Sequence, residues 1–447
     1  MRARVAASVI ALSILAACGG EDRSEVSTPA APEAGSPEAT PETEETVAID
    51  QIAEGFVKLA LGAGQHDPNF VDAYDGPPEW QAAAIADKRS LEDLEADAQR
   101  LLTDLEKLGE PDARALMLQK LLTAALTRIR MTQGRTFPFD EETRLLYDAV
   151  APAYDLKTFD AALAEIDKLL PGEGPLNERV DAFRNSLAIP KDRMLDVFNA
   201  AIAECRRRTV AHFDLPLNES FTLEFVTDKP WSGYNWYQGD YESLIQVNTD
   251  LPIVIDRAVD LGCHEGYPGH HTWHSLIDRE LVKGNGWVEY SVYPLFSPAS
   301  VIAEGSGNYG IELAFPGDEK IAFERDVLFP LAGLDPEKAA TLDALNKLRR
   351  KLSHADNHAA REYLEGRMSK DEAVESLMKY TLASRERAEQ RVRFIATYRG
   401  YVINYNVGRD LVAGFVERAE AAGENPWDAF GSLLMTPRPA SALTARE

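Results

Sequence analysis

The chain has 447 residues, 45% of them hydrophobic, and a formal net charge of −26 at pH 7. So negative a chain argues against nucleic acid as a partner, because proteins that bind nucleic acid present basic surfaces to its phosphates. The hydrophobic share is ample for a large folded core.

The first residues carry the pattern of an export signal. Arg2 and Arg4 precede an apolar run over 5–17, which is too short for a stable membrane span and is typical of a signal peptide over 1–17. The run ends in Leu-Ala-Ala-Cys, which resembles a lipobox, so we expect cleavage before Cys18 and lipidation of that cysteine. An ordinary secretory signal followed by an incidental cysteine is the alternative.

The residues after the cysteine indicate where the chain is held. Gly19, rather than Asp, resembles lipoproteins sent to the outer membrane, so we expect the periplasmic face of a bacterial outer membrane, with the lipid on Cys18 as the only attachment. The segment 18–46 is rich in Pro, Glu, Ser, Thr and Ala and cannot bury enough apolar area to offset its ordering entropy. We expect an extended tether there. No second long apolar run follows, so no membrane span is expected.

Leucine periodicity predicts a helical lobe over 47–214. Ser90 is the expected cap of a helix whose leucines run from Leu91 to Leu105, and a second helix is expected over 116–129. Further helices are predicted over 141–152, 158–170, 175–187 and 190–212. We expect this lobe to pack with a second lobe over 215–447 as one unit.

The sequence pattern changes at the start of the second lobe. The segments 221–226 and 243–248 read as strands, and 230–239 reads as an aromatic loop with two glycines. That loop either walls a pocket for an apolar side chain or packs into the core. A helix that begins near Pro252 then runs into a histidine-rich segment. The fold class expected is mainly α with a small β-sheet, α+β.

Four of the eight histidines gather within eleven residues, His264 among them. Neutral imidazoles bind zinc, and an adjacent carboxylate such as Glu265 can act as general base. On a regular helix, six residues separate His264 from His270 by about 9 Å and place them on different sides. Pro268 cannot donate to a preceding carbonyl and Gly269 tolerates unusual torsions, so we expect a widened or broken turn that brings His270 beside His264. The alternative is a histidine-rich helix end without metal.

A third metal ligand is expected further along the chain. Catalytic zinc sites commonly combine two histidines with one glutamate and leave a fourth position for water. Glu304 is followed by Gly305, Ser306 and Gly307, and small neighbours on a helix allow a glutamate to approach a metal closely. We therefore assign a Zn²⁺ ion to His264, His270 and Glu304.

Cys205 and Cys263 are the cysteines that remain besides Cys18. An oxidising periplasm would allow one bridge between them. We favour two buried small side chains on separate helices. Cys263 is not assigned to the metal, because adjacent helical residues point about 100° apart.

Three segments in order carry a family resemblance. They are His-Glu-Gly-Tyr-Pro-Gly-His-His at 264–271, Glu-Gly at a helix start at 304–305, and Tyr-Val-Ile-Asn-Tyr-Asn-Val-Gly at 401–408. They resemble the bacterial family known as domain of unknown function 885, over about Val47 to the C-terminus. Its members are often lipoproteins, and it is grouped with the HExxH-type zinc peptidases whose third ligand is a glutamate.

The resemblance implies a choice among neighbouring residues. In the family pattern the residue directly after Pro-Gly is consistently a histidine, which favours His270 over His271 as a ligand. The resemblance also favours Glu304 as the third ligand. His271 is then expected to orient a neighbour or to contact substrate. Asn406 stands where relatives often carry Lys, so any role of that lysine is in doubt here. The fold implied is a large helical, zincin-like metallohydrolase.

A mechanism follows as an expectation. The metal lowers the pKa of its water, Glu265 takes the proton, and the hydroxide attacks a carbonyl polarised by the metal. Tyr405 is the expected donor to the developing oxyanion, with a packed aromatic on the last long helix as the alternative. His354 and His358 flank Asp356 and are expected on an exposed helix face, with a donor role for one of them as the alternative.

The function expected is a zinc metallopeptidase that is lipid-anchored in the periplasm and acts on peptides or small amides. In zinc peptidases the strand just before the metal helix often presents its edge to an extended substrate, which makes 243–248 the candidate edge. A non-catalytic lipoprotein that keeps the zinc fold as a binding module is one alternative, and the intact Glu265 argues against it. A zinc hydrolase of non-peptide amides or esters is another. Nothing in the sequence indicates a cleavage preference or an oligomeric state.

Overall fold

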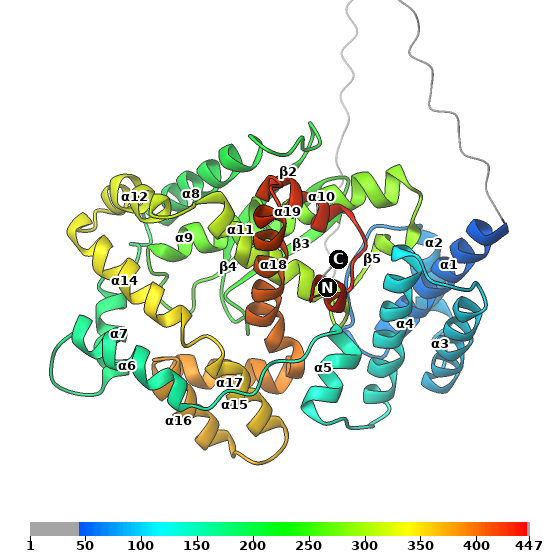
Figure 1. Cartoon of the computed structure of the whole chain (residues 1–447), viewed down its shortest axis with the longest axis horizontal. Coiled ribbons are helices and arrows are strands. Elements are labelled where there is room, and N and C mark those ends of the chain that lie inside the picture. Colours follow the sequence, from blue (N-terminus) through cyan, green and yellow to red (C-terminus); the bar gives the residue numbers. More distant parts are fainter. Residues whose placement is uncertain (1–43, 445–447) are drawn as a thin grey trace, which may run out of the picture. The chain divides into compact units, whose positions relative to one another are not determined.

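The computed structural model describes residues 44–444 (Figure 1). The expected signal peptide, the lipidation at Cys18 and nearly all of the expected tether lie outside the described residues. The described residues belong to one compact unit. The lobe boundary expected near residue 214 stays a prediction.

The first half of the described chain is almost entirely helical, as the leucine periodicity predicts. Ser90 caps α3 as expected, because its hydroxyl accepts a hydrogen bond from the backbone N–H of Asp93. Each predicted helix of this region coincides with an observed one, with ends that differ by a few residues. The helices are α1 (Glu44–Gly64), α2 (Pro78–Ala86), α3 (Leu91–Glu106), α4 (Ala113–Thr132), α5 (Phe139–Tyr147), α6 (Lys157–Leu169), α7 (Leu176–Asn185) and α8 (Met194–Thr209).

The strands form two small sheets. One pairs β1 (Val71–Tyr74) with β5 (Val292–Pro294) in antiparallel fashion. The other has the order β2-β4-β3, in which β4 (Glu242–Asn248) pairs in parallel with β2 (Ser220–Val226) and antiparallel with β3 (Gly233–Gly239). The mainly α fold with small sheets is therefore confirmed.

The second half carries the histidine-rich segment and the helices that surround it. Some of its helical elements are short turns of other types, labelled η. They are α9 (Asp256–Leu261), η1 (Gly262–Gly266), α10 (His270–Ile277), η2 (Asp278–Gly284), η3 (Val288–Ser291), α11 (Pro298–Ala314), α12 (Glu319–Phe323), η4 (Glu324–Leu328), α13 (Phe329–Ala332), η5 (Pro336–Lys338), α14 (Ala339–Arg350), α15 (Ala355–Leu364), α16 (Lys370–Tyr380), α17 (Arg385–Tyr398), η6 (Arg399–Val402), α18 (Ile403–Ala421), α19 (Pro426–Met435) and η7 (Ala440–Thr444).

Two sequence predictions about the sheet are wrong. The segment 230–239 is not a loop, because Gly233–Gly239 forms β3, whose aromatic side chains suit a strand once β4 lies beside it. The strand predicted over 243–248 is present as β4, but it is the central strand and presents no free edge. Within the described residues, β2 and β3 are the two edge strands of this sheet.

Cys205 and Cys263 also differ from expectation. They form a disulfide between α8 and η1, with Cα atoms 5.5 Å apart, and both residues are fully buried. The two cysteines do lie on separate helical elements, but those elements are in direct contact, which a separation of 58 residues in sequence does not reveal.

Helices α11 and α18 lie side by side and form the scaffold behind the histidine-rich segment (Figure 1). Glycines permit their close approach, because a Cβ added at Gly305 would lie 2.4 Å from the carbonyl oxygen of Gly408. Within residues 44–444, no helix combines the length and the apolar character that crossing a lipid bilayer requires.

Candidate metal centre

The backbone between α9 and α10 forms the widened turn that the sequence predicts. Residues 262–266 adopt a π-helical turn, in which Tyr267 N–H donates to the carbonyl of Gly262. The chain then breaks at Pro268, and Gly269 N–H donates to the carbonyl of Cys263 at 3.0 Å. A Cβ at Gly269 would lie 1.9 Å from the carbonyl oxygen of His264, so only glycine fits there. The Pro-Gly pair thus ends one helix and starts the next at His270.

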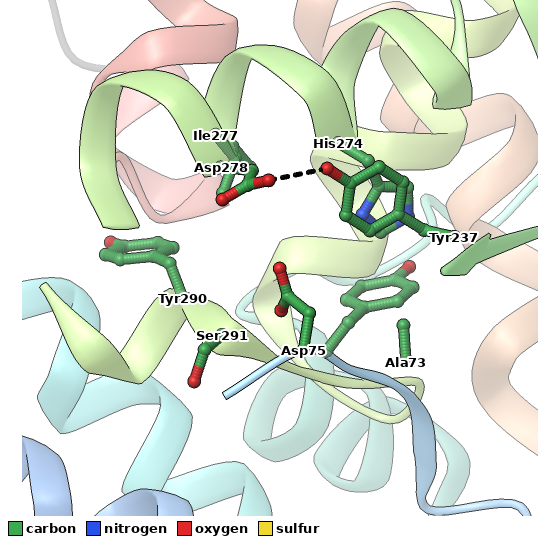
Figure 2. Close-up of a pocket in the computed structure, with 9 residues that line it drawn as sticks. Ala73, Asp75, Tyr237, His274, Ile277, Asp278, Tyr290 and Ser291 are labelled. Atoms are coloured by element: carbon green, nitrogen blue, oxygen red, sulfur yellow. Dashed lines mark hydrogen bonds between the residues drawn. The ribbon is translucent and has the colours of Figure 1, made fainter. Parts of the chain in front are cut away.

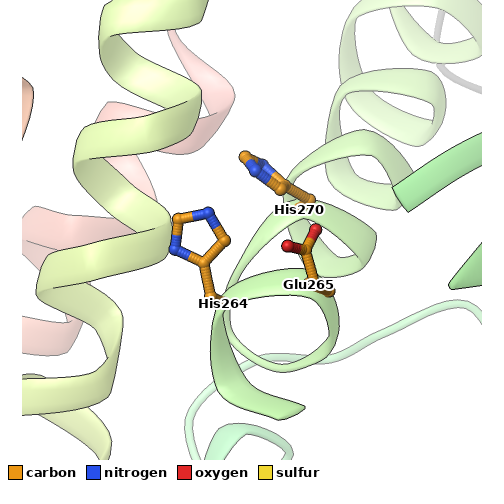
Figure 3. A group of neighbouring side chains, drawn as sticks. All are labelled: His264, Glu265 and His270. Atoms are coloured by element: carbon orange, nitrogen blue, oxygen red, sulfur yellow. The ribbon is translucent and has the colours of Figure 1, made fainter. Parts of the chain in front are cut away.

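This turn brings His264, Glu265 and His270 together (Figure 3). One ligand atom from each lies within 4.8 Å of the other two. The imidazole centroids of the two histidines are 4.7 Å apart, with the rings nearly perpendicular at 86°. His264 and Glu265 are buried, and His270 is partly buried.

Glu304 reaches the same place from α11. It lies in the interior of that helix and not at a helix start, which corrects the sequence reading. Its Oε2 lies 3.2 Å from Nε2 of His264 and 4.0 Å from Nε2 of His270. The imidazole of His264 packs on α11 at Gly307, where an added Cβ would lie 2.9 Å from ring atoms. The small residues after Glu304 therefore make room for the histidine.

Other polar side chains orient these groups, and the sequence reasoning missed them. Asn308 Oδ1 lies 3.2 Å from Nδ1 of His264, which leaves Nε2 facing Glu304. Tyr401 donates its hydroxyl to Oε1 of Glu304 at 2.6 Å. Asn308 stands one turn after Glu304, and Tyr401 opens the last of the recognised segments. Their positions were available in the sequence, but their contacts depend on how α11, η6 and α18 pack.

Burial and charge shift the protonation of the cluster. Burial, together with the charges of Glu304 and Asp72, raises the pKa of Glu265 to about 7. Burial and the neighbouring His264 lower the pKa of His270 to about 4, which keeps that imidazole neutral. Burial opposes the charged form of His264, but contact with Glu304 and the charge of Glu265 raise its pKa. The pKa of Glu304 is lowered, because its histidine contacts outweigh burial.

The cluster fits a zinc ion. Within residues 44–444, Oε2 of Glu304 and Nδ1 of His270 are buried without a hydrogen-bond partner. Ligand atoms at 2.0–2.2 Å from one tetrahedral zinc lie about 3.3 Å apart. The separations of 3.2 and 4.0 Å from Glu304 to the two histidines are close to that value. Two imidazoles and a carboxylate are a common ligand set of catalytic zinc.

Distance alone also admits Glu265 as the third ligand, since it belongs to the group within 4.8 Å. Glu304 differs from Glu265 in that its buried Oε2 has no hydrogen bond within the described residues and faces the Nε2 atoms of both histidines. Glu265 sits beside the cluster at the edge of β3. Its Oε1 would be 2.8 Å from a Cβ at Gly233, so the absent side chain leaves the carboxylate its space.

His271 belongs to a different cluster. It is fully buried, with Nδ1 2.8 Å from Ser243 Oγ and Nε2 2.9 Å from Glu219 Oε2. Glu219 also accepts from Arg206 and from the hydroxyl of Tyr267. Because both nitrogens are used and no surface is exposed, His271 orients its neighbours and contacts neither metal nor substrate.

Of the remaining predicted residues, one lies near the metal-binding group and two make their contacts elsewhere. Tyr405 lies near the cluster, since Asn308 donates to its carbonyl oxygen at 2.9 Å and its ring centroid is 5.9 Å from that of Tyr401. Within the described residues its hydroxyl makes no hydrogen bond, whereas that of Tyr401 is engaged. His354 is instead bound to Asp410 at 2.9 Å. His358 is partly buried on α15 and is not part of the metal-binding group.

The chain matches no family model and no curated protein. Its resemblance to the domain-of-unknown-function 885 family therefore stays a prediction.

Among solved structures, the chain is similar to one from Colwellia psychrerythraea described as a lipoprotein, with TM-score 0.50 and 14% identity, over 91% of this chain and 76% of that one. It also overlaps a lipoprotein of unknown function from Shewanella oneidensis, with TM-score 0.45 and 14% identity, over 82% and 75%. An M32 carboxypeptidase from Deinococcus radiodurans R1 gives TM-score 0.45 and 15% identity, over 88% and 90%. The first likeness is one of fold, and the other two overlaps are too loose to support an argument.

Proposed function

We propose that the chain is a zinc-dependent hydrolase of peptide bonds, with the ion held by His264, His270 and Glu304 and with Glu265 as general base. The observation that carries the proposal is that Oε2 of Glu304, which is buried and has no hydrogen bond within the described residues, faces Nε2 of His264 at 3.2 Å and Nε2 of His270 at 4.0 Å. Leaving a buried polar atom unpaired costs about 1–3 kcal/mol, so a site that keeps such atoms is best explained by a ligand that satisfies them.

Each residue has a role in the proposed reaction. A zinc ion bound there would act as a Lewis acid and acidify a water molecule. Glu265 accepts the proton of the attacking water on its carboxylate. Tyr405 offers an unengaged hydroxyl to the oxyanion. Tyr401 and Asn308 hold Glu304 and His264 in orientation.

Within the described residues β3 is an edge strand, which supports a peptide as the substrate. Asn235, in the middle of β3, donates to the carbonyl oxygen of Glu265 at 2.7 Å, so this strand runs directly beside the proposed base. An extended peptide can add to such an edge through main-chain hydrogen bonds.

The location is part of the same proposal. We place the protein in the family named domain of unknown function 885, exported and lipid-anchored at Cys18 on the periplasmic face of the outer membrane. The disulfide Cys205–Cys263 supports an oxidising compartment. The fold likeness to a chain described as a lipoprotein agrees with this.

Two measurements on purified protein test the function. We expect about one zinc per chain, and we expect a library of short peptides to be hydrolysed in a chelator-sensitive way. Glu265→Gln should keep its zinc and lose about 10²–10⁴-fold in turnover, because that is what a positioned base contributes.

Glu224→Gln is the matched control, since it makes the same change on an exposed position of β2. Undiminished turnover in zinc-loaded Glu265→Gln would remove Glu265 as the base. Absence of zinc from the native protein would remove the enzyme assignment.

A further inference from the structure

A small cavity lies next to the metal centre. It has a volume of about 10 Å³, which is room for one water-sized group. Its walls come from the elements that border the metal cluster: His274 from α10, Ala73 from β1 and Tyr237 from β3. His274 stands one turn beyond His270, and Ala73 follows Asp72, which accepts a hydrogen bond from Tyr234 of β3.

Two carboxylates face this cavity (Figure 2). Asp278 is only 2% exposed, and its Oδ2 accepts from the Tyr237 hydroxyl at 2.8 Å and from Lys283 at 3.0 Å. Its Oδ1 has no partner within residues 44–444. Asp75 turns its carboxylate toward Asp278, and no side chain of the described part donates to it. Burial and the charge of Asp278 raise the pKa of Asp75 to about 7.

The charges around the cavity do not balance. Asp75 and Asp278 carry two negative charges, and Lys283 supplies one positive charge. His274 adds none, since burial lowers its pKa well below the ordinary value. Asp240 lies further out, with a side chain 92% exposed, and pairs with Lys283. The cavity therefore keeps one uncompensated negative charge when both aspartates are ionised.

The acceptors that face the cavity match one kind of ligand. Oδ1 of Asp278 and the two oxygens of Asp75 are acceptors, and a primary ammonium group has three N–H donors and the size of a water molecule. Its single positive charge would balance the cavity.

The cavity stands at a useful distance from the reacting bond. Four residues of helix from His270 to His274 rise about 6 Å. Two residues of strand from Asn235, beside Glu265, to Tyr237 span about 7 Å. A peptide extended along β3 would then present to the cavity either an amino terminus about two residues from the cleaved bond or a lysine side chain.

We propose that the cavity between Asp75 and Asp278 is a substrate subsite for a primary ammonium group. The inference rests on the proposed function, and it narrows the substrate class to peptides that present an α-amino group or a lysine near the bond to be cleaved.

The test measures binding in the zinc-loaded Glu265→Gln protein, in which substrate is not consumed. Calorimetric titration compares trialanine, N-acetyl-trialanine and N-acetyl-Ala-Lys-Ala. We expect trialanine or the lysine peptide to bind about tenfold or more tightly than N-acetyl-trialanine, because charge-assisted hydrogen bonds are strong in a buried site. Which of the two is preferred identifies the source of the ammonium group.

The variants assign the preference to the cavity. Asp75→Asn should abolish it, and Asp278→Asn provides a second variant should the first fail to fold. Asp240→Asn, with the same charge change outside the cavity, should keep it. Equal affinity for acetylated and free peptides, a preference that survives Asp75→Asn, or no binding by any peptide would overturn the subsite.

Failure of the subsite can be told apart from failure of the function. A native protein that binds zinc and hydrolyses acetylated peptides as fast as free ones keeps the function and loses the subsite. A protein without zinc or hydrolysis that still prefers the free amine through Asp75 loses the function and keeps the recognition of ammonium.

Discussion

Two histidine–carboxylate clusters meet at the start of α10, and adjacent residues serve them. His270 joins His264 and Glu304, whereas His271 joins Glu219 and Ser243. Both clusters are buried. In the second, each carboxylate oxygen of Glu219 and each nitrogen of His271 has a partner. In the first, Oε2 of Glu304 and Nδ1 of His270 have none within the described residues.

The difference in hydrogen bonding distinguishes a cluster that stabilises the fold from a cluster that can bind a ligand. A polar cluster whose atoms satisfy one another stabilises the fold and has no capacity left for a ligand. A cluster that keeps unpaired buried atoms sacrifices stability and retains that capacity. The comparison thus predicts that changes on the His270 side affect metal and turnover, and that changes on the His271 side affect folding.

Among variants outside the metal ligands and the general base, the largest effect is expected for Tyr405→Phe. If its free hydroxyl stabilises the oxyanion, kcat should fall about 10²–10³-fold while zinc content stays the same. Tyr398→Phe, which removes a hydroxyl from the neighbouring helix end, is the control. A steady-state assay with zinc quantified in each sample decides, and unchanged kcat in Tyr405→Phe would reduce that residue to a packed aromatic.

The next effect concerns stability and the cluster around His271. His271→Ala should lower the free energy of unfolding by about 2–3 kcal/mol, since it leaves Ser243 and one contact of Glu219 unpaired in a buried place. Zinc per folded chain should stay as in the native protein. Urea denaturation of the metal-free protein measures the first quantity, and a loss of zinc with unchanged stability would contradict it.

A smaller change is expected for Asn308→Ala. Removing the group that orients His264 should weaken zinc affinity about 10–100-fold without loss of fold. Competition with a fluorescent chelator gives the affinity, and Asn218→Ala, on an exposed position, is the control. Equal affinity in the two variants would show that Asn308 does not position the ligand.

The last effects concern the pH dependence of stability, whose sign differs between Asp72 and Glu219. Burial raises the pKa of Asp72, near the metal cluster, from 3.8 to about 7, so the folded protein keeps a proton there that the unfolded chain releases. Asp72→Asn should therefore gain stability over the native protein as pH rises from about 4 to about 7, by at most about 1.4 kcal/mol per pH unit.

Glu219 should behave in the opposite way. Its contacts with His271, Tyr267 and Arg206 outweigh burial and lower its pKa below 4.5. It therefore contributes stability above about pH 4.5 that is lost as pH falls through its folded value. Glu219→Gln should be less stable than the native protein at neutral pH, and the gap should narrow in acid. Denaturation of the metal-free proteins at several pH values measures both effects. If the stability of either variant ran parallel to that of the native protein across pH, the predicted difference between Asp72 and Glu219 would be contradicted.

The sequence predicts much of this site because the informative features are local. Pro268 and Gly269 indicate a broken turn. The small residues after Glu304 indicate a helix that another group can approach closely. The helices are predicted from their leucine spacing for the same reason.

What the sequence did not predict depends on partners distant in the chain. The segment 233–239 becomes a strand only because β4 lies beside it, and its two glycines suggested a loop. Cys205 and Cys263 meet only when α8 packs on η1. Tyr401 acts on Glu304 across 97 residues.

Zinc per chain in a matched pair of variants tests the central claim most directly. Metal analysis of the native protein, His270→Ala and His271→Ala, each checked for folding, should give about one, none and about one. Zinc retained by His270→Ala, or lost equally from both folded variants, would contradict the assignment of the metal to the unsatisfied cluster.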